Sequence, residues 1–143
     1  SGLMEKLEIE GSPKTPIVSF DPESGHFELK GRSIPENAVN FYKPIYDWLD
    51  TYVTSPAKCT TLAVKLEYFN TSSTLVIRNL IRDLSQSEAK TELYVKWYYE
   101  EYDEDMKEAI QKYVNDTHLD VTSIELGDDL KEAAKCHEII ISY

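Results

Sequence analysis

A predicted strand gives way to a predicted helix within the stretch Lys65-Leu66-Glu67-Tyr68-Phe69-Asn70-Thr71-Ser72-Ser73-Thr74. Before the junction, apolar residues alternate from Leu62 to Tyr68, a spacing that is typical of a half-buried strand. After it, apolar residues recur at steps of three and four, which is the spacing of one helix face. These residues are Val76, Ile77, Leu80, Ile81 and Leu84. We therefore expect a strand that stops at Asn70 and an amphipathic helix that begins in the hydroxyl run.

Hydroxyl side chains occupy every position from Thr71 to Thr74. At a helix start, such side chains accept hydrogen bonds from free backbone N–H groups. The same helix end carries about half a positive charge, which favours a phosphate group. Two interpretations stay open on spacing alone. Either Thr71 or Ser72 is simply the N-cap of the helix, or the hydroxyl run is a regulatory phosphorylation site.

The N-terminal part of the chain predicts strands followed by a helix. Apolar residues alternate with charged ones at 7–9, and the Pro and Gly of the turn at 21–25 predict a β-hairpin. The segment Ser33-Ile34-Pro35-Glu36 has the spacing of a capping box, which predicts a helix start at Ser33. This helix should be irregular at Pro44 and should end at Ser55-Pro56.

The C-terminal part continues the alternation of strands and helices. We expect a strand from Glu92 to Tyr99, a third helix opened by the acidic run at 100–105, and a strand from Val121 to Leu126. A short helix and an apolar strand at 139–141 are expected beyond Gly127. Strands that alternate with helices predict an α/β fold with a mixed sheet, in which the N-terminal hairpin is the antiparallel element.

Length and charge restrict the possible partners. A chain of 143 residues predicts one domain. The net charge is −11 and no cluster of Lys and Arg is present, so the sequence argues against nucleic-acid binding through phosphate contacts. An anionic membrane would repel the same charge, and no apolar run approaches the roughly 18 residues of a membrane helix. Such a charge instead suits docking on a basic patch of another protein.

The start of the chain, Ser1-Gly2-Leu3 before Met4, lacks the basic and apolar regions of a signal peptide. We expect residues 1–3 to be a cloning remnant, Met4 to be the natural start, and the cytoplasm to be the compartment. The two cysteines, Cys59 and Cys136, are too few for a disulfide framework and lack the spacing of a metal site.

Catalytic motifs are missing from the sequence. The glycines are scattered, no serine lies in a GxSxG context, and no histidine has an evident partner. We therefore expect no enzyme activity, no cofactor and no metal. The alternative is a cation-dependent enzyme that uses the acidic run at 100–105, since alternating carboxylates suit Mg²⁺ or Ca²⁺. Acidic residues also stabilise the first turn of a helix, so a solvated helix start explains the run without a metal.

Aromatic residues cluster next to the acidic run. On a strand, Trp97 and Tyr99 face one way and Tyr98 faces the other, so we expect at least one of them at the surface. Exposed aromatic side chains ringed by charge are typical of interfaces. The candidate docking surface consists of Trp97, Tyr98, Tyr99, Glu100 and Glu101. The alternative is a sheet that helices cover on both faces.

The junction sequence Lys65–Ser73 resembles the signature of the SiaC family of bacterial regulatory phosphoproteins. Three further segments resemble the family in the same order: Gly11–Pro16, Gly31–Ala38, and Trp97–Glu101 with Asp103–Met106. Residues 4–127 are accordingly expected to be the family domain, and residues 128–143 a C-terminal extension. The chain departs from the family pattern in that extension and at Thr74-Leu75, where other members often carry a lysine or another residue.

The resemblance implies a STAS-like fold, similar to the anti-sigma-factor antagonist domain, in agreement with the predicted mixed sheet and crossover helices. It implies phosphorylation on the threonine of the Asn-Thr-Ser-Ser motif, here Thr71. The residues that flank this switch and contact partners would be Tyr68, Asn70, Ser72 and Ser73. The implied partners are a serine/threonine kinase, a PP2C-type phosphatase and a diguanylate cyclase, which the unphosphorylated form binds and controls in cyclic-di-GMP signalling. An unregulated scaffold is the alternative.

Overall fold

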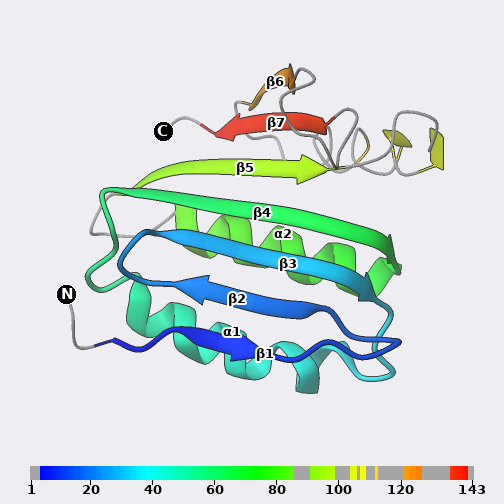
Figure 1. Ribbon diagram of the computed structural model, residues 1–143, viewed down its shortest axis with the longest axis horizontal. Helices are drawn as coiled ribbons and strands as arrows, with labels where there is room; N and C mark the ends of the chain where they lie inside the picture. The colour runs from blue at the N-terminus through cyan, green and yellow to red at the C-terminus, as the bar shows by residue number, and fades with distance from the viewer. Residues whose placement is uncertain are drawn as a thin grey trace.

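The computed structural model describes residues 4–85, 91–98, 104–105, 107–108, 112, 121–126 and 136–141. In these ranges, strands form one sheet in the order β1-β2-β3-β4-β5-β7-β6, with two helices beside it (Figure 1). The strands are β1 (Leu7–Ile9), β2 (Ile17–Asp21), β3 (His26–Ser33), β4 (Cys59–Phe69), β5 (Glu92–Tyr98), β6 (Val121–Leu126) and β7 (Cys136–Ile141). The helices are α1 (Ala38–Tyr52) and α2 (Thr71–Ser85). Neither described helix is long and apolar enough to cross a membrane.

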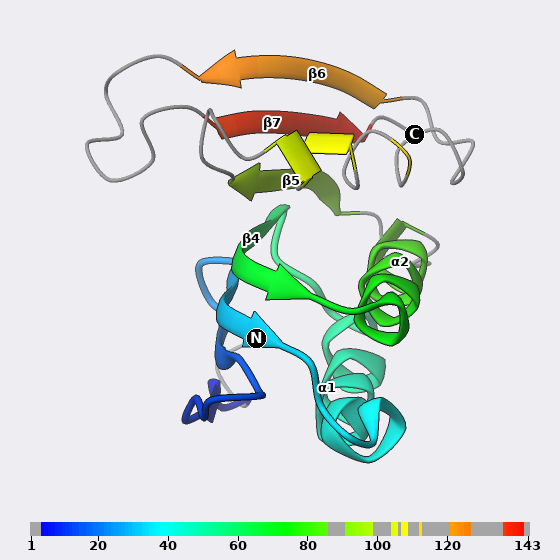
Figure 2. The same ribbon diagram turned by 90° about the vertical axis from the view of Figure 1, so that its right-hand side faces the viewer.

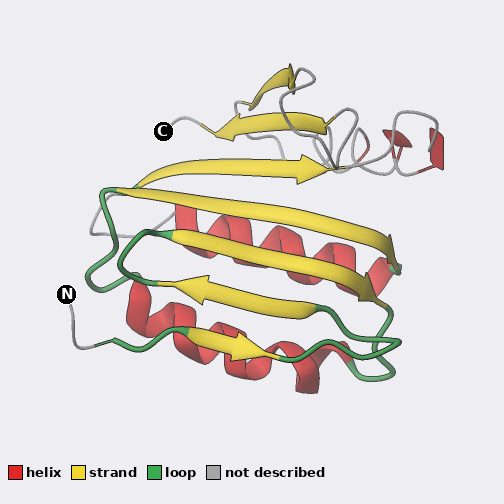
Figure 3. Ribbon diagram, viewed as in Figure 1, coloured by secondary structure: helices red, strands yellow, loops and turns green. Residues whose placement is uncertain are grey.

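The strand directions confirm the predicted α/β class with a mixed sheet. Strands β2 and β3 form the expected antiparallel hairpin, whereas β3, β4 and β5 are parallel neighbours. Each parallel step is made by a crossover helix, so α1 and α2 both begin at the carboxyl end of a strand and run in the same direction. Figures 2 and 3 show both helices on one face of the sheet. This places the N-terminal ends of α1 and α2 at a single edge of the molecule.

The core lies between that face of the sheet and the two helices. Strands β2 to β5 alternate between side chains that are buried against the helices and side chains on the opposite, open face. Helix α1 buries Tyr42, Ile45, Leu49 and Tyr52 against the sheet. Helix α2 contributes its predicted apolar stripe, Val76, Ile77, Leu80, Ile81 and Leu84, all of which are buried.

A β-bulge near the end of β4 changes which residues face the helices. Gly31 pairs with Leu66, but the next residue of β3, Arg32, pairs with Tyr68, so Glu67 is the extra residue. Gly31 has a φ of +112° at this register shift, a conformation that favours glycine. The prediction that Tyr68 continues the alternation from Leu62 was therefore wrong. Tyr68 turns to the open face and is 54% exposed, while Phe69 packs with Trp97 at a ring-centroid distance of 5.6 Å.

The predicted capping box at Ser33 was also wrong. Ser33 is the last residue of β3 and pairs with Phe69, because strand pairing takes precedence over the local cap pattern. The N-cap of α1 is Asn37, whose Oδ1 accepts a 3.1 Å hydrogen bond from the backbone N–H of Asn40. The helix runs through Pro44 to Tyr52.

The two C-terminal strands extend the sheet beyond β5. Strand β7 is antiparallel to both of its neighbours, β5 and β6, and lies between them (Figure 1). It contains the apolar strand predicted at 139–141, and β6 coincides with the strand predicted at 121–126. The helix predicted in 128–135 lies outside the described residues, and the boundary at residue 127 stays a prediction.

Candidate functional site

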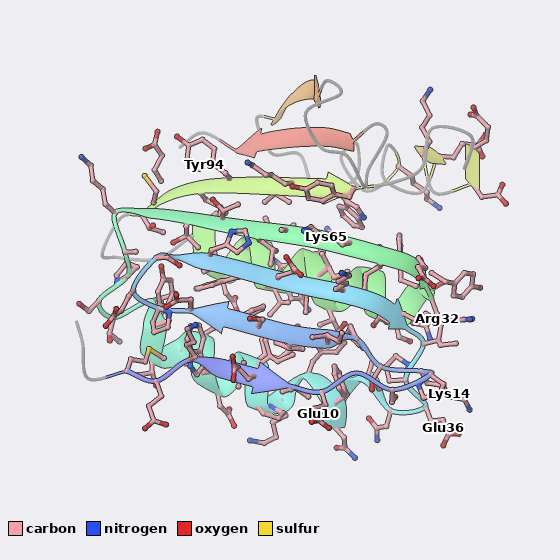
Figure 4. The ribbon with its side chains drawn as sticks, viewed as in Figure 1. Glu10, Lys14, Arg32, Glu36, Lys65 and Tyr94 are labelled. Carbon is pink, nitrogen blue, oxygen red and sulfur yellow. The ribbon has the colours of Figure 1, made fainter. Side chains whose placement is uncertain are left out.

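The candidate site lies where β3 and β4 end and α1 and α2 begin. Figure 4 shows Lys14, Arg32 and Glu36 at this same edge of the molecule. The backbone N–H of Ile34 donates to the Lys14 carbonyl across 2.9 Å, and Lys14 Nζ lies 3.1 Å from a Glu36 carboxylate oxygen. The predicted junction at Asn70 is therefore part of an edge to which the loop at Lys14 and the segment before α1 also contribute.

Asn70 caps helix α2. Its Oδ1 accepts a 2.9 Å hydrogen bond from the backbone N–H of Ser73, and its carbonyl accepts bonds from the N–H and the hydroxyl of Thr74 at 3.1 and 3.2 Å. Its own N–H donates to the Ser33 carbonyl across 3.1 Å. The interpretation of Thr71 or Ser72 as the N-cap was therefore wrong, because the residue that precedes the hydroxyl run already fills that role.

Thr71 is the first residue of α2, and both Thr71 and Ser72 are exposed. The first turn of α2 contains no acidic residue. The partial positive charge of the helix end is thus not offset by a carboxylate within that turn. The two exposed hydroxyls are therefore presented to solvent in a setting that tolerates negative charge.

Ser73 lies in the same hydroxyl run but is fully buried. Its hydroxyl oxygen is 2.7 Å from the Ser33 carbonyl oxygen and 2.7 Å from the Ser33 hydroxyl oxygen, which lies 2.7 Å from the Tyr42 hydroxyl oxygen. Each hydroxyl has one proton, and the Ser73 proton goes to the carbonyl. The Ser33 proton then goes to Ser73 and the Tyr42 proton to Ser33. This ordered hydroxyl chain connects β3, α1 and α2.

Burial raises the pKa of Tyr42 to about 12, against the smaller opposing effect of its hydrogen bond to Ser33. The phenol therefore keeps its proton and acts as the donor that opens the chain. The sequence pattern missed Ser33, which it treated as a cap, and it gave no role to Tyr42. The signal in the pattern was a tyrosine at a core-facing position, since a buried Tyr hydroxyl usually has a hydrogen-bond partner.

The aromatic candidates divide between core and surface. Trp97 is fully buried on the helix-covered face, which removes it from the predicted docking surface. Tyr98 is half-buried on the open face, where Lys65 Nζ lies 5.0 Å from its ring centroid. The remaining candidates of that surface, Tyr99, Glu100 and Glu101, lie outside the described residues. Tyr68 is exposed, with the Arg32 guanidinium carbon 5.9 Å from its ring centroid.

The described part of the chain contains no group of three or more His, Cys, Asp or Glu side chains arranged to hold a metal ion. In the acidic run at 100–105, only Glu104 and Asp105 are described, and both are helical and exposed. Chemically, the edge presents the Thr71 and Ser72 hydroxyl groups to solvent at the start of a helix.

A family model described as SiaC family regulatory phosphoprotein matches residues 9–135. An uncharacterized protein of Pseudomonas aeruginosa (strain UCBPP-PA14) is 25% identical over 114 residues, which cover 79% of this chain and 90% of that protein.

Solved structures share the fold. The crystal structure of apo-SiaC from Pseudomonas aeruginosa has a TM-score of 0.65 at 26% identity, over 79% of this chain and 93% of that one. The crystal structure of diguanylate cyclase SiaD in complex with its activator SiaC, from the same organism, contains a chain with a TM-score of 0.70 at 24% identity. That match covers 77% of this chain and 91% of the other.

Proposed function

Because the chain belongs to the SiaC family of regulatory phosphoproteins, we propose that it is a signalling adaptor switched by phosphorylation of Thr71. The unphosphorylated form binds and controls an effector protein, and phosphorylation releases it. The effector is a diguanylate cyclase or a similar enzyme, a serine/threonine kinase adds the phosphate, and a PP2C-type phosphatase removes it. These components act in the cytoplasm.

One observation supports this proposal above the others. Thr71 is exposed at the first position of α2, while its neighbours Asn70 and Ser73 fasten that helix start to Ser33 of β3. The residue that would carry the phosphate is thus separate from the residues that hold the fold together. A kinase can reach the Thr71 hydroxyl without opening the core.

The effect of the phosphate follows from its charge and position. A phosphothreonine adds about −1.5 to −2 charges and three acceptor oxygens. At a helix N-terminus the dipole stabilises such a group by about 0.3–1 kcal/mol, so the fold should persist. An effector surface that packs against the same helix end would have to accommodate a hydrated dianion. The switch therefore blocks an interface and leaves the domain itself unchanged.

The test compares Thr71→Glu and Thr71→Ala, with Ser72→Ala as the matched control at the adjacent exposed hydroxyl. Binding to SiaD of Pseudomonas aeruginosa and to diguanylate cyclases from this protein's own source would be measured by calorimetry, together with cyclase activity. We expect Thr71→Glu to weaken binding by about tenfold or more, which corresponds to about 1.4 kcal/mol. Circular dichroism and the melting temperature should barely move. Thr71→Ala and Ser72→Ala should both still bind.

Intact-mass measurement and peptide mapping of the protein from its native cells would locate the modification. A phosphate on Thr71 is the expected result. Phosphate on Ser72 or Thr74 would move the switch, and protein without phosphate that still binds its effector would favour an unregulated scaffold. Unchanged effector affinity in a folded Thr71→Glu variant would end the proposal.

A further inference from the structure

The open face of the sheet carries a row of side chains that runs across the strands. Ile17 of β2 pairs with Lys30 of β3, and Lys30 pairs with Lys65 of β4. The row ends on β5 at Tyr98, whose ring centroid lies 5.0 Å from Lys65 Nζ. We call Ile17, Lys30, Lys65 and Tyr98 the transverse row. Each member comes from a different strand, so the sequence alone shows no cluster of basic residues.

The transverse row places two lysines side by side. Like charges directly opposite each other on neighbouring strands destabilise a sheet. Lys65 Nζ lies 3.1 Å from a Glu28 carboxylate oxygen, whereas Lys30 takes part in none of the ion pairs between described residues. Arg32, two residues further along β3, also lies outside those ion pairs, and its guanidinium contacts the ring of Tyr68. In the view of Figure 4, from the open face, Lys65 lies over β4 and Arg32 near the end of β3.

The sign of the charge on the open face changes along the strands but stays the same across them. Along β3, Glu28 precedes the row and Arg32 follows it. A partner that lay along β3 would therefore meet both signs within a few residues. A partner that crosses the strands instead meets two lysines, with Ile17 at one end, 47% exposed, and the half-buried ring of Tyr98 at the other. The row thus favours a partner with two carboxylates between two apolar groups.

An α-helix matches the spacing of the row. Neighbouring strands lie about 4.8 Å apart, so four strands span about 14 Å. Helix positions i, i+4, i+7 and i+11 share one face and span about 16 Å. Apolar residues at the two outer positions would contact Ile17 and Tyr98. Glutamates at the two inner positions would lie against Lys30 and Lys65.

Other occupants fit the row less well. Two copies of this chain related by a two-fold axis would bring the same face together and place lysine against lysine. A nucleic acid carries charge along its whole length, and it would also meet Glu28 and the other acidic surfaces of a chain with a net charge of −11. A short acidic helix is governed by nearby charges, because exposed charges are screened beyond about 8 Å at physiological ionic strength.

We propose that the transverse row is a docking surface for an acidic amphipathic helix of a second protein partner, distinct from the effector. Helices α1 and α2 cover the other face of the sheet, so a partner on the open face leaves the start of α2 accessible (Figure 2). Binding at the row is therefore independent of the state of Thr71. The chain then links this partner to the effector that the phosphate controls, which goes beyond the proposed function.

The test is an NMR titration of the ¹⁵N-labelled full chain with a synthetic peptide of about 16 residues, a length at which isolated helices begin to be stable. The peptide carries Leu at i and i+11 and Glu at i+4 and i+7, with Ala and Gln elsewhere. A control peptide of the same composition carries the two Glu on the opposite face of the helix. We expect the first peptide to shift the amide signals of the transverse row, with an affinity that falls as salt is added. The control peptide should bind at least tenfold more weakly.

Variants with matched controls make the test specific. Lys30→Gln should weaken peptide binding by about two- to fivefold, as expected for an exposed ion pair. Lys43→Gln removes the same charge from α1, where Lys43 pairs with Asp47, and should have no effect. Ile17→Ser should weaken binding by about three- to tenfold. Val39→Ser, at an exposed apolar residue of α1, is its control and should bind as the wild type does.

The titration is repeated with Thr71→Glu, which should bind the peptide with unchanged affinity. Loss of binding in this variant would mean that the row and the switch are one surface, and it would overturn the proposal. The proposal would also be overturned by an absence of binding, by equal binding of the control peptide, or by equal losses in Lys30→Gln and Lys43→Gln. Tighter binding of poly(U) or of anionic lipid vesicles at the same residues would identify a different class of partner. Dimerisation that Lys30→Gln abolishes would identify a second copy of the chain.

Discussion

The hydroxyl of Ser73 donates to the backbone carbonyl of Ser33 across 2.7 Å and so fastens the first turn of α2 to the end of β3. Ser73→Ala removes this bond and leaves the Ser33 hydroxyl without its acceptor. We expect the free energy of unfolding to fall by about 1–3 kcal/mol, the usual cost of an unsatisfied buried polar group. Urea unfolding measures this loss. Ser72→Ala, at the exposed neighbour, should change stability by less than about 0.5 kcal/mol, and similar losses in both variants would contradict the hydroxyl chain.

Tyr42 makes the free energy of unfolding depend on pH in the alkaline range. Its pKa is raised from 10.0 to about 12 in the folded protein, so the folded state holds the proton that the unfolded state releases above pH 10. The stability contributed by Tyr42 is therefore complete below pH 10 and is lost as the pH rises towards 12. Between about pH 9 and pH 11, the advantage of the wild type over Tyr42→Phe should shrink by about 1.4 kcal/mol. Guanidinium unfolding of both proteins at several pH values checks this, and a constant difference would contradict it.

Asn70 should stabilise α2 more than the threonine that follows it. Asn70→Ala removes the acceptor of the Ser73 backbone N–H and should cost about 1 kcal/mol, as is typical for an N-cap. Faster amide hydrogen exchange at Ser73 and Thr74 would localise the effect to the first turn. Thr71→Ala is the control and should leave both exchange rates nearly unchanged. Equal acceleration in the two variants would mean that Thr71 shares the capping role.

Two glycines with positive φ differ in the space around them. Gly25 has a φ of +72°, and a Cβ at this position would lie 2.1 Å from the Cys59 carbonyl oxygen, whereas a Cβ at Gly31 would meet nothing within 4 Å. Gly31→Ala should therefore cost only the backbone strain, about 1–3 kcal/mol. Gly25→Ala adds a clash with backbone and should destabilise the protein further. Thermal unfolding of the two variants measures the order, and a milder loss for Gly25→Ala would contradict it.

The sequence predicted correctly those elements that depend on residues only a few positions apart. The turn at 21–25, the strand that ends before Asn70 and the apolar stripe of α2 all depend on neighbours within a few positions. Trp97 shows the limit of such patterns. Alternation along a strand says that neighbouring side chains face opposite ways, but only the packed fold shows which face the helices cover. The same limit applies to Ser33, whose pairing with Phe69 comes from a strand far along the chain.

The choice of Thr71 among the four hydroxyl residues depends on information that their spacing in the sequence does not contain. Spacing predicted a helix start rich in hydroxyls, and the structure distinguishes exposed Thr71 and Ser72 from buried Ser73. This distinction depends on β3 and α1, which approach the helix start only after folding. Phosphorylation of Thr71 stays a prediction that follows from the family resemblance.

The extra residue at Glu67 determines the direction in which the start of α2 faces. With the same residues in regular alternation from Leu66 and no bulge, the inward and outward sides of the strand end would be exchanged. Tyr68 would then turn into the core, Phe69 would turn to water, and Asn70 would be rotated away from the Ser33 carbonyl. The angular position of Thr71 therefore depends on a local irregularity of β4, in which two residues lie opposite one residue of β3.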